Sequence, residues 1–133
     1  AIEGDTIRQE FLTPKSTKVG RKAYEEVVEG MRLAVTDGTC RAANIPGLDI
    51  CGKTGTAQNR GKDHSAFMGF APMDNPKIAV SVYVENGGWG ATYGVPIGAL
   101  IIEKYLNGKL SPQSEVKAND IQMRRIDYGI HER

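Results

Sequence analysis

Gly52-Lys53-Thr54-Gly55-Thr56-Ala57-Gln58 is a stretch near the middle of the 133-residue chain, with apolar segments before and after it. It places a lysine, two hydroxyl groups and two glycines within five residues. Groups of this kind hold anions, and glycines let a ligand approach the backbone closely. This stretch is therefore the candidate binding element, and the segments around it indicate how the fold presents it.

The neighbouring segments predict a three-stranded antiparallel sheet. Residues 48–58 read as a strand that carries the stretch, 64–71 as a strand that is apolar on both faces and so central, and 77–85 as a strand with strict alternation. Polar turns at 59–63 and 72–76 join them, which gives an antiparallel meander. The outer edge of the third strand has no partner in this chain. Strands from a missing portion would pair there, and an exposed edge also predicts self-association.

One helix is expected before the meander in the chain and one after it. Residues 22–36 place apolar side chains at helical spacing, and Gly38 would end that helix in the left-handed conformation. The second helix begins between Thr92 and Pro96 and ends at Gly108. The predicted fold class is α+β, a three-stranded antiparallel meander flanked by two helices.

The ends of the chain carry weaker signals. Residues 6–12 read as a short strand, and residues 110–133 as a polar surface tail with a short helix around 121–126. The tail is either a solvated extension or a docking segment for another envelope protein. The length allows one domain, which gives a domain portion at 1–109 followed by the tail. Because the chain starts with Ala1 rather than Met, we expect it to be processed or excised from a longer protein.

The composition argues against several classes of protein. The net charge of +1 offers no electrostatic attraction for nucleic acid or an anionic membrane. No apolar run approaches the roughly 20 residues of a membrane span, and the N-terminus has no secretory signal pattern. Cys40 and Cys51 are expected to be buried thiols with no zinc-site spacing, although sequence does not decide whether they pair. No cofactor or metal is expected.

Two motifs compete for the candidate stretch. Residues 47–54 satisfy the phosphate-loop pattern G-x-x-x-x-G-K-[ST] letter for letter. That loop requires a buried strand before it and a helix that starts at the lysine. Residues 39–46 are not an apolar strand, and the polar turn that follows the stretch does not open a helix well. A nucleotide-binding protein is therefore the less favoured alternative.

The second motif is a K-T-G strand. Alternation puts Lys53 and Gly55 on one face of that strand and Thr54 and Thr56 on the other. A site that uses all four residues must lie at the edge of the strand, where an extended peptide-like ligand can pair. There Lys53 supplies positive charge, the hydroxyls donate to a carboxylate, and a backbone N–H helps to hold an oxyanion.

The wider context resembles the penicillin-recognising family of serine D,D-transpeptidases, carboxypeptidases and β-lactamases. The resemblance runs over about 27–106 and is carried by Gly30-Met31, Gly38-Thr39, Gly52 to Gln58, Asp63-His64, Phe67 to Pro72, Ile78 to Gly88 and Pro96-Ile97. It is most similar to the C-terminal part of the transpeptidase domain in class B penicillin-binding proteins of the elongation (rod-shape) type. The resemblance thus implies the C-terminal part of a β-lactamase/transpeptidase-like fold.

The resemblance also implies roles for the K-T-G residues. Lys53 would contribute charge near the acid/base network, and Thr54 and Thr56 would bind the carboxylate of a D-Ala-D-Ala stem peptide or a β-lactam. Gly55 would leave room for the substrate backbone, and the Thr56 backbone N–H would form half of the oxyanion hole. The implied parent crosslinks peptidoglycan by serine acyl transfer in the periplasm. An N-terminal segment would anchor it in the inner membrane, beside a glycan polymerase of the rod-shape system.

The nucleophile of that family is missing from the expected place. The motif S-x-x-K occurs only at Ser114–Lys117, in the polar tail, and S-x-N does not occur. The family order puts S-x-x-K well upstream, so Ser114 is taken as a false match. We expect neither transpeptidase activity nor a covalent penicillin adduct from these residues alone. The alternatives are a non-catalytic β-lactam-binding or sensor module of the same fold, and a stand-alone structural domain.

His64 and Trp89 are further candidates for a functional role because of their residue types. His64 is expected to be structural, because no Cys, Asp or second His lies at a useful spacing. Trp89, among glycines, is either a loop residue that contacts substrate or a residue that packs over the core.

Overall fold

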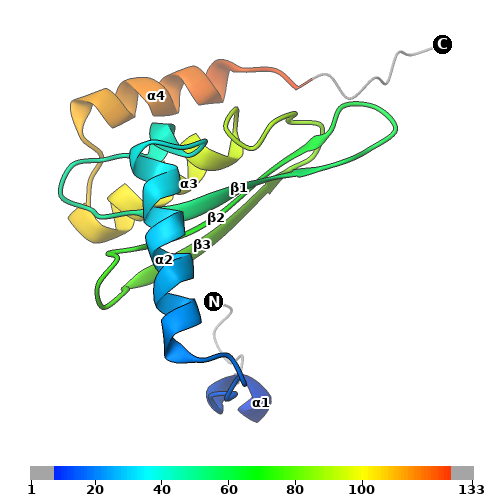
Figure 1. Cartoon of the computed structure of the whole chain (residues 1–133). Coiled ribbons are helices and arrows are strands. Elements are labelled where there is room, and N and C mark those ends of the chain that lie inside the picture. The colour runs from blue at the N-terminus through cyan, green and yellow to red at the C-terminus, as the bar shows by residue number, and fades with distance from the viewer. Residues whose placement is uncertain (1–7, 127–133) are drawn as a thin grey trace.

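The structure, a computed structural model, describes residues 8–126 and builds them around one antiparallel sheet (Figure 1). The elements in chain order are α1 (Gln9–Leu12), α2 (Arg21–Thr36), the 3-10 turn η1 (Arg41–Ala43), β1 (Cys51–Ala57), β2 (His64–Ala71), β3 (Ile78–Val84), α3 (Gly94–Asn107) and α4 (Pro112–Met123).

The strands lie in the order β1-β2-β3, and both pairs are antiparallel. The predicted meander and its central second strand are therefore confirmed. Thr54 pairs with Phe67, which pairs with Val82, so these three residues share one face of the sheet. Phe67 and Val82 are buried, whereas Met68 and Tyr83 on the opposite face are 59% and 57% exposed. The sheet thus has one covered face and one open face.

Helix α3 covers the buried face, where it packs on β2 and β3. Gly98 makes this possible, because a Cβ at this position would overlap the ring of Phe67. The helix has Pro96 in its first turn and ends at Gly108, as the sequence predicted, and the φ of 71° at Gly108 is the left-handed conformation typical of a helix end. The core is made of Val35, Cys40, Ala43, Leu48, Ile50, Phe67, Ala71, Val95, Ala99 and Ile102.

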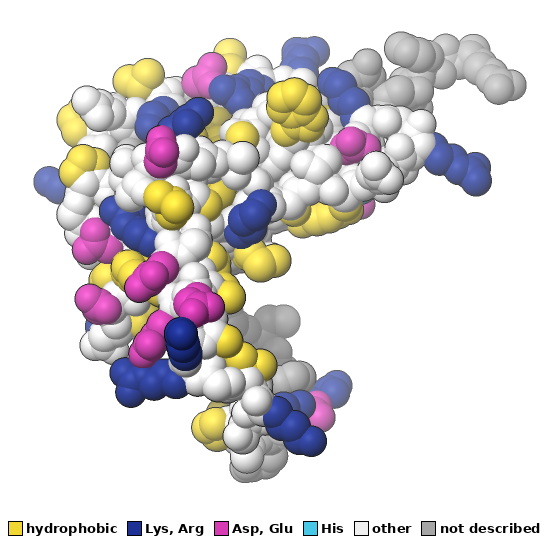
Figure 2. Space-filling model, in the orientation of Figure 1, with side chains coloured by type: hydrophobic (Ala, Val, Ile, Leu, Met, Phe, Trp, Pro, Cys, Tyr) yellow, Lys and Arg dark blue, Asp and Glu magenta, His cyan; other side chains and the backbone are white. Residues whose placement is uncertain are grey.

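Helix α2 begins within one residue of its predicted start, but only its C-terminal half packs on the sheet. The N-terminal half extends away from the sheet (Figure 1), and Tyr24 and Val27 are 50% and 59% exposed. Charges of both signs are interspersed along this helix (Figure 2). They include an exposed ion pair of 2.7 Å between Arg21 and Glu25, a contact that contributes little to stability.

The predicted left-handed cap at Gly38 is wrong. The helix ends through Asp37, whose backbone N–H donates to the Leu33 carbonyl at 2.9 Å, and Gly38 does not have a positive φ. Glycine is needed there for another reason. A Cβ on Gly38 would lie 2.7 Å from the Cα of Ala34, so the chain can turn back closely against α2 only without a side chain.

Both chain ends differ from the sequence predictions. The described part of 6–12 is the short helix α1, so a strand there is wrong, and residues 6 and 7 lie outside the described residues. The short helix predicted around 121–126 is also wrong, because α4 already begins at Pro112 and ends at Met123. Residues 112–123 are therefore a helix that packs on α3 rather than an irregular tail.

The start of α4 explains this difference. The Ser111 hydroxyl accepts the Ser114 backbone N–H at 3.3 Å, and Pro112 occupies the first turn, two features that favour a helix start. The buried Glu103 carboxylate on α3 accepts the Ser111 backbone N–H at 3.1 Å. Burial raises the pKa of Glu103, but hydrogen bonds from Ser114 and Ser111, together with Lys117, outweigh it and leave the pKa below its ordinary value. A charged carboxylate thus anchors α4 to α3. None of the described helices is long and apolar enough to cross a membrane.

Candidate functional site: the open edge of the first strand

The candidate stretch lies on β1, at one edge of the sheet. β1 pairs with β2 on one side only, and no other strand of the described residues pairs with its second edge. Lys53 and Thr56 are exposed, and Thr54 and Gly55 are half-buried. The predicted edge position of this strand is confirmed. The phosphate-loop alternative is wrong, because the chain continues as a strand from Lys53 to Ala57 and no helix begins at the lysine.

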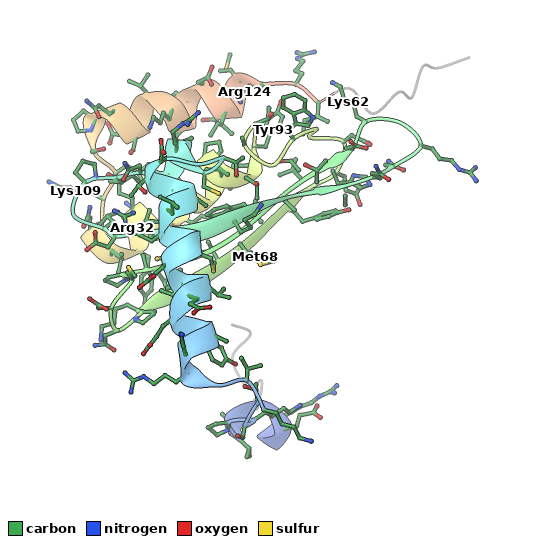
Figure 3. All side chains as sticks on the ribbon, viewed as in Figure 1. Arg32, Lys62, Met68, Tyr93, Lys109 and Arg124 are labelled. Atoms are coloured by element: carbon green, nitrogen blue, oxygen red, sulfur yellow. The ribbon has the colours of Figure 1, made fainter. Side chains whose placement is uncertain are left out.

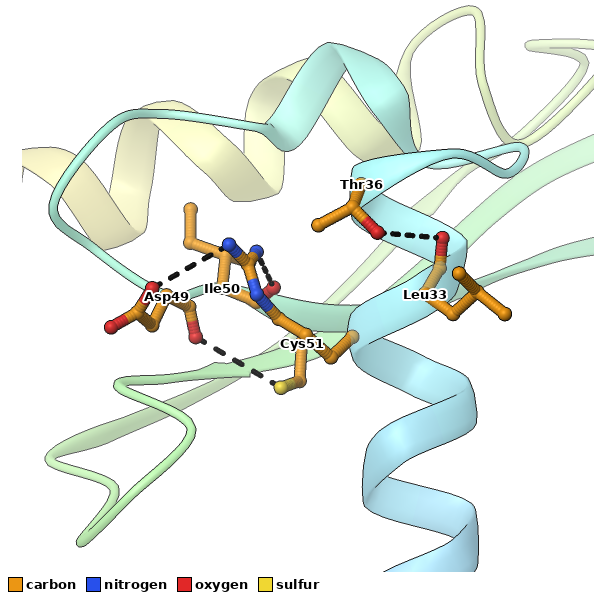
Figure 4. A network of polar contacts seen from close by, with 6 residues as sticks. Leu33, Thr36, Asp49, Ile50 and Cys51 are labelled. Carbon is orange, nitrogen blue, oxygen red and sulfur yellow. Dashed lines mark hydrogen bonds and ion pairs between the residues drawn. The ribbon is translucent and has the colours of Figure 1, made fainter.

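The beginning of β1 is held by an arginine of α2 (Figure 4). Arg32 donates from Nη1 to the Ile50 carbonyl at 2.9 Å, and its Nη2 lies 3.5 Å from the Asp49 carboxylate. Asp49 has a φ of 45°, in the left-handed region. A strand cannot continue through that conformation, so β1 begins at Cys51 rather than at the predicted residue 48. Arg32 thereby fixes where the K-T-G strand starts relative to α2.

Lys53 and the Thr54 hydroxyl meet at the edge although they start on opposite faces of the strand. The Lys53 Nζ donates to the Thr54 carbonyl at 3.0 Å and lies 3.4 Å from the Thr54 Oγ1. The Thr39 hydroxyl lies 2.9 Å from the same Oγ1, in hydrogen-bond contact. An ammonium group and two hydroxyls therefore gather at one point, which suits the recognition of a carboxylate. Sequence reasoning did not name Thr39 as a site residue, and its only signal was the Gly38-Thr39 pair within the resemblance.

The backbone of β1 also offers donors at this edge. Burial raises the pKa of the Cys40 thiol, while hydrogen bonds from Thr39 and from the Thr54 backbone, together with Lys53, oppose the rise. The Thr54 backbone can donate only through its N–H, so this N–H points away from β2 and is taken by the Cys40 thiol. Because alternate residues of a strand point their N–H groups to the same side, the Thr56 N–H also lies at the open edge.

The two cysteines are free and buried, as the sequence predicted. Burial raises the pKa of Cys51 as it does that of Cys40, although Arg32 opposes the rise at Cys51. Both are therefore poor nucleophiles at neutral pH. In the described part of the chain, no three His, Cys, Asp or Glu side chains gather as metal ligands would.

A glycine-rich segment, residues 87–93, packs against β1 at the candidate site, and we call it the glycine loop. A Cβ on Gly90 would lie 2.8 Å from the Gly55 carbonyl and 3.0 Å from the Thr54 Cβ. The buried Ser65 holds the loop, since its hydroxyl donates to the Trp89 carbonyl at 2.9 Å and accepts the Gly94 N–H at 3.0 Å. The loop therefore lies over the Gly55–Ala66 pair and supports the candidate strand from the β2 side, a neighbour that sequence reasoning did not identify.

Trp89 and His64 have different positions around this loop. Trp89 is 75% exposed and does not pack over the core, so contact with a substrate stays a prediction. His64 accepts the Asn86 N–H on its Nδ1 at 2.9 Å, and its ring lies 5.3 Å from that of Tyr83. These contacts agree with the prediction of a structural or surface histidine.

Two hollows open beside Lys53. One of about 350 Å³ lies against α2 and is lined by Gly30, Leu33, Ala34, Asp37, Gly38 and Lys53. The other, of about 220 Å³, lies on the sheet and includes Met68 and Tyr83 of the open face. By contrast, Ser114 of the S-x-x-K match is only 4% exposed and lies on α4, where its backbone N–H is capped by Ser111. The structure therefore does not bring Ser114 to the K-T-G edge.

Comparison with known proteins gives concordant matches. The sequence profile of the family described as penicillin binding protein transpeptidase domain matches residues 2–123. The chain is 32% identical over 106 residues to peptidoglycan D,D-transpeptidase MrdA of Haemophilus influenzae. The aligned residues cover 80% of this chain and 16% of that protein.

Solved structures give the same result. PBP2 of Pseudomonas aeruginosa in complex with WCK 5153 has a TM-score of 0.59 at 38% identity, over 75% of this chain and 23% of that chain. The ceftriaxone acyl-enzyme complex of penicillin-binding protein A from Mycobacterium tuberculosis has a TM-score of 0.58 at 33% identity, over 64% of this chain and 21% of that chain. The chain spans about a fifth of the length of these proteins.

Proposed function

Since this chain belongs to the penicillin-binding protein transpeptidase domain family, we propose that it is the C-terminal part of a peptidoglycan D,D-transpeptidase of the elongation type. The observation that carries the proposal is the open edge of β1. An ammonium group and two hydroxyls converge there, and the Thr56 backbone N–H faces the same edge. The small share of the relatives that the chain covers supports its being one part of a larger domain.

In this proposal an extended stem peptide lies along β1 as an additional strand. Lys53 and the hydroxyls of Thr54 and Thr56 bind the terminal carboxylate, and Gly55 leaves space for the peptide backbone. A serine outside this chain attacks the carbonyl of the D-Ala-D-Ala bond, and the Thr56 N–H stabilises the oxyanion. The terminal D-Ala leaves with a proton on its amine, and the amine of a second stem peptide then takes the acyl group. A β-lactam would occupy the same edge.

The rest of the proposed protein has several tasks. It supplies the nucleophile, and its strands pair with the outer edge of β3, opposite the edge of β1 that binds the peptide. It also covers the open face with Met68 and Tyr83, which otherwise exposes apolar side chains to water. The isolated chain is expected to self-associate through the same surfaces. We place the whole protein in the periplasm, anchored to the inner membrane by an N-terminal segment and partnered by a glycan polymerase of the rod-shape system.

Labelling with a fluorescent penicillin, read by intact mass and peptide mapping, tests this function. The full-length protein is expected to carry the adduct on a serine outside the 133 residues, and the isolated chain is expected to stay unlabelled. In the full-length protein, Thr54→Ala should slow acylation about tenfold, as expected for losing one hydrogen bond to a charged group. Thr36→Ala is the matched control and should not change the rate, because the exposed Thr36 hydroxyl bonds only the Leu33 carbonyl of its own helix and lines neither hollow beside Lys53.

Two outcomes would contradict the proposal: an adduct on Ser114, or a full-length protein that does not react. A full-length protein that is acylated but never transfers the acyl group to an amine would instead favour the sensor module. The K-T-G edge is compatible with both, so transfer to an acceptor amine is the measurement that separates them.

A further inference from the structure

The end of α4 reaches across to the glycine loop through one side chain. Arg124, the residue after α4, donates from Nη1 to the Thr92 carbonyl at 2.9 Å, although 32 positions separate the two in sequence. Its Nε and Nη2 donate to the Asp120 carboxylate at 3.0 and 2.6 Å. The guanidinium carbon also lies 5.5 Å from the centre of the Tyr93 ring (Figure 3). One cation thus contacts two consecutive residues at the end of the loop.

A hollow separates part of α4 from the loop beside these contacts. A hollow of about 270 Å³ lies between them, lined by Ala42, Ala91, Thr92, Pro96, Asp120 and Ile121 among others. Because this space is not filled by side chains, apolar packing does not replace the arginine contacts. The Asp120 carboxylate orients the guanidinium, and hydrogen bonds from a charged donor are stronger than neutral ones.

Several contacts constrain the glycine loop along its length. Gly87, Gly88 and Gly90 give the loop a larger conformational freedom than other residues would. Its first part is fixed by the Gly88 N–H, which donates to the Asp63 carbonyl at 2.8 Å, and its middle by Ser65. Its last part is closed by the Thr92 N–H, which donates to the Trp89 carbonyl at 2.9 Å, and by the Val95 N–H, which donates to the Gly90 carbonyl at 3.0 Å. Arg124 adds a side-chain contact from another element to this turn. Between these anchors, Gly90 presses on the K-T-G strand.

We propose that Arg124 is a positioning residue for ligand binding at the K-T-G edge, acting through the glycine loop. Asp120 and Arg124 hold the Thr92 carbonyl, and the loop then keeps Gly90 over the paired residues Gly55 and Ala66. This contact supports β1 from the β2 side, so that its opposite, unpaired edge keeps the position at which a peptide or β-lactam lies. The proposal rests on the function proposed above. A purely structural arginine would only stabilise the end of α4 and would leave the loop and the ligand unaffected.

The loop itself is measured first, in the 133-residue chain, where Trp89 is the single tryptophan. Arg124→Ala should raise hydrogen exchange of the loop amides about tenfold and increase acrylamide quenching of Trp89, as expected for losing a charge-assisted hydrogen bond. Arg124→Lys should give a smaller increase, because an ammonium group cannot serve Thr92 and Asp120 with the geometry of a guanidinium.

The neighbouring Arg125 provides the matched control. It is exposed, and Arg125→Ala should leave loop exchange and quenching unchanged. Circular dichroism checks that each variant is folded. Faster exchange confined to α4 in Arg124→Ala, with an unchanged loop, would overturn the proposal.

Penicillin acylation of the full-length protein then tests the link to the ligand. Arg124→Ala should raise the dissociation constant of the initial complex about fivefold and leave the acylation step unchanged, because the loop touches the docking edge and not the nucleophile. An unchanged dissociation constant despite a mobile loop would overturn the positioning role. A wild-type protein that is not acylated would instead contradict the proposed function, and the exchange data would still decide whether Arg124 holds the loop.

Discussion

Replacing Gly90 with alanine tests the contact between the glycine loop and β1 most directly. The added Cβ would lie 2.5 Å from the Ala66 carbonyl oxygen and 2.8 Å from the Gly55 carbonyl oxygen, whereas ordinary contacts begin at 3.4 Å. Both obstacles are backbone atoms of paired strands, which cannot rotate away as a side chain can. The loop or the strand must therefore move by roughly half an ångström to one ångström, in a protein interior that is close-packed.

The cost follows from this overlap. Overpacking of this kind destabilises a protein by about 1–3 kcal/mol. For a chain of this length, about 2 kcal/mol should lower the melting temperature by roughly 5–10 °C. Thermal unfolding followed by circular dichroism measures it. The matched control is Gly61→Ala in the turn before β2, where a Cβ would meet nothing within 4 Å and φ is not positive.

The outcome separates two descriptions of the site. If Gly90→Ala melts within about 1 °C of the wild type, as Gly61→Ala should, then the loop does not pack closely on β1 and β2, and its role as a support of the K-T-G strand is refuted. If it melts lower but binds penicillin normally in the full-length protein, the contact supports the fold and not the ligand.

Three further predictions concern the surroundings of the edge. Thr39→Val keeps the shape but removes the hydroxyl beside Thr54, so stopped-flow acylation of the full-length protein should slow about fivefold to tenfold while the melting temperature changes little. Arg32→Ala leaves the Ile50 carbonyl without its donor and should lower the free energy of unfolding in urea by about 1–3 kcal/mol; an unchanged urea midpoint would contradict this role. Glu103 has a lowered pKa in the folded chain, so its stabilisation is present above the unfolded value of about 4.3 and is lost as pH falls through the lower folded value. Glu103→Gln should therefore melt below the wild type at pH 7, and the difference should shrink in acid; a constant difference down to pH 3 would refute this.

Local patterns in the sequence were sufficient for the sheet and for α3. Strict alternation in β3 and an apolar run in β2 follow from the period of two in a strand, and each can be read within a few residues. Pro96 and Gly108 mark the two ends of α3 for equally local reasons. The family, too, followed from the K-T-G motif, but only together with the further matching residues spread over about 27–106.

Helix α4 could not be found in this way. It has few apolar side chains and no apolar stripe, which is the signal that periodicity detects. Its start depends on Ser111 and on the Glu103 carboxylate of another helix. The first half of α2 shows the opposite case, in which the pattern was present but the packing was not. Its apolar stripe predicted a buried face, whereas Tyr24 and Val27 are exposed in this chain.

The K-T-G stretch divides in the same manner. Its residue types, its strand conformation and its need for an edge could be derived from seven consecutive letters, because all three depend on neighbours in sequence. The contacts that complete the site could not. Thr39 comes from the turn after α2, Gly90 from a loop after β3 and Arg124 from the far end of the chain. Only the packing of the sheet and its helices brings these residues to Thr54 and to the glycine loop. Contacts between residues that are distant in the chain leave no local pattern in a single sequence, so they could not be predicted from it.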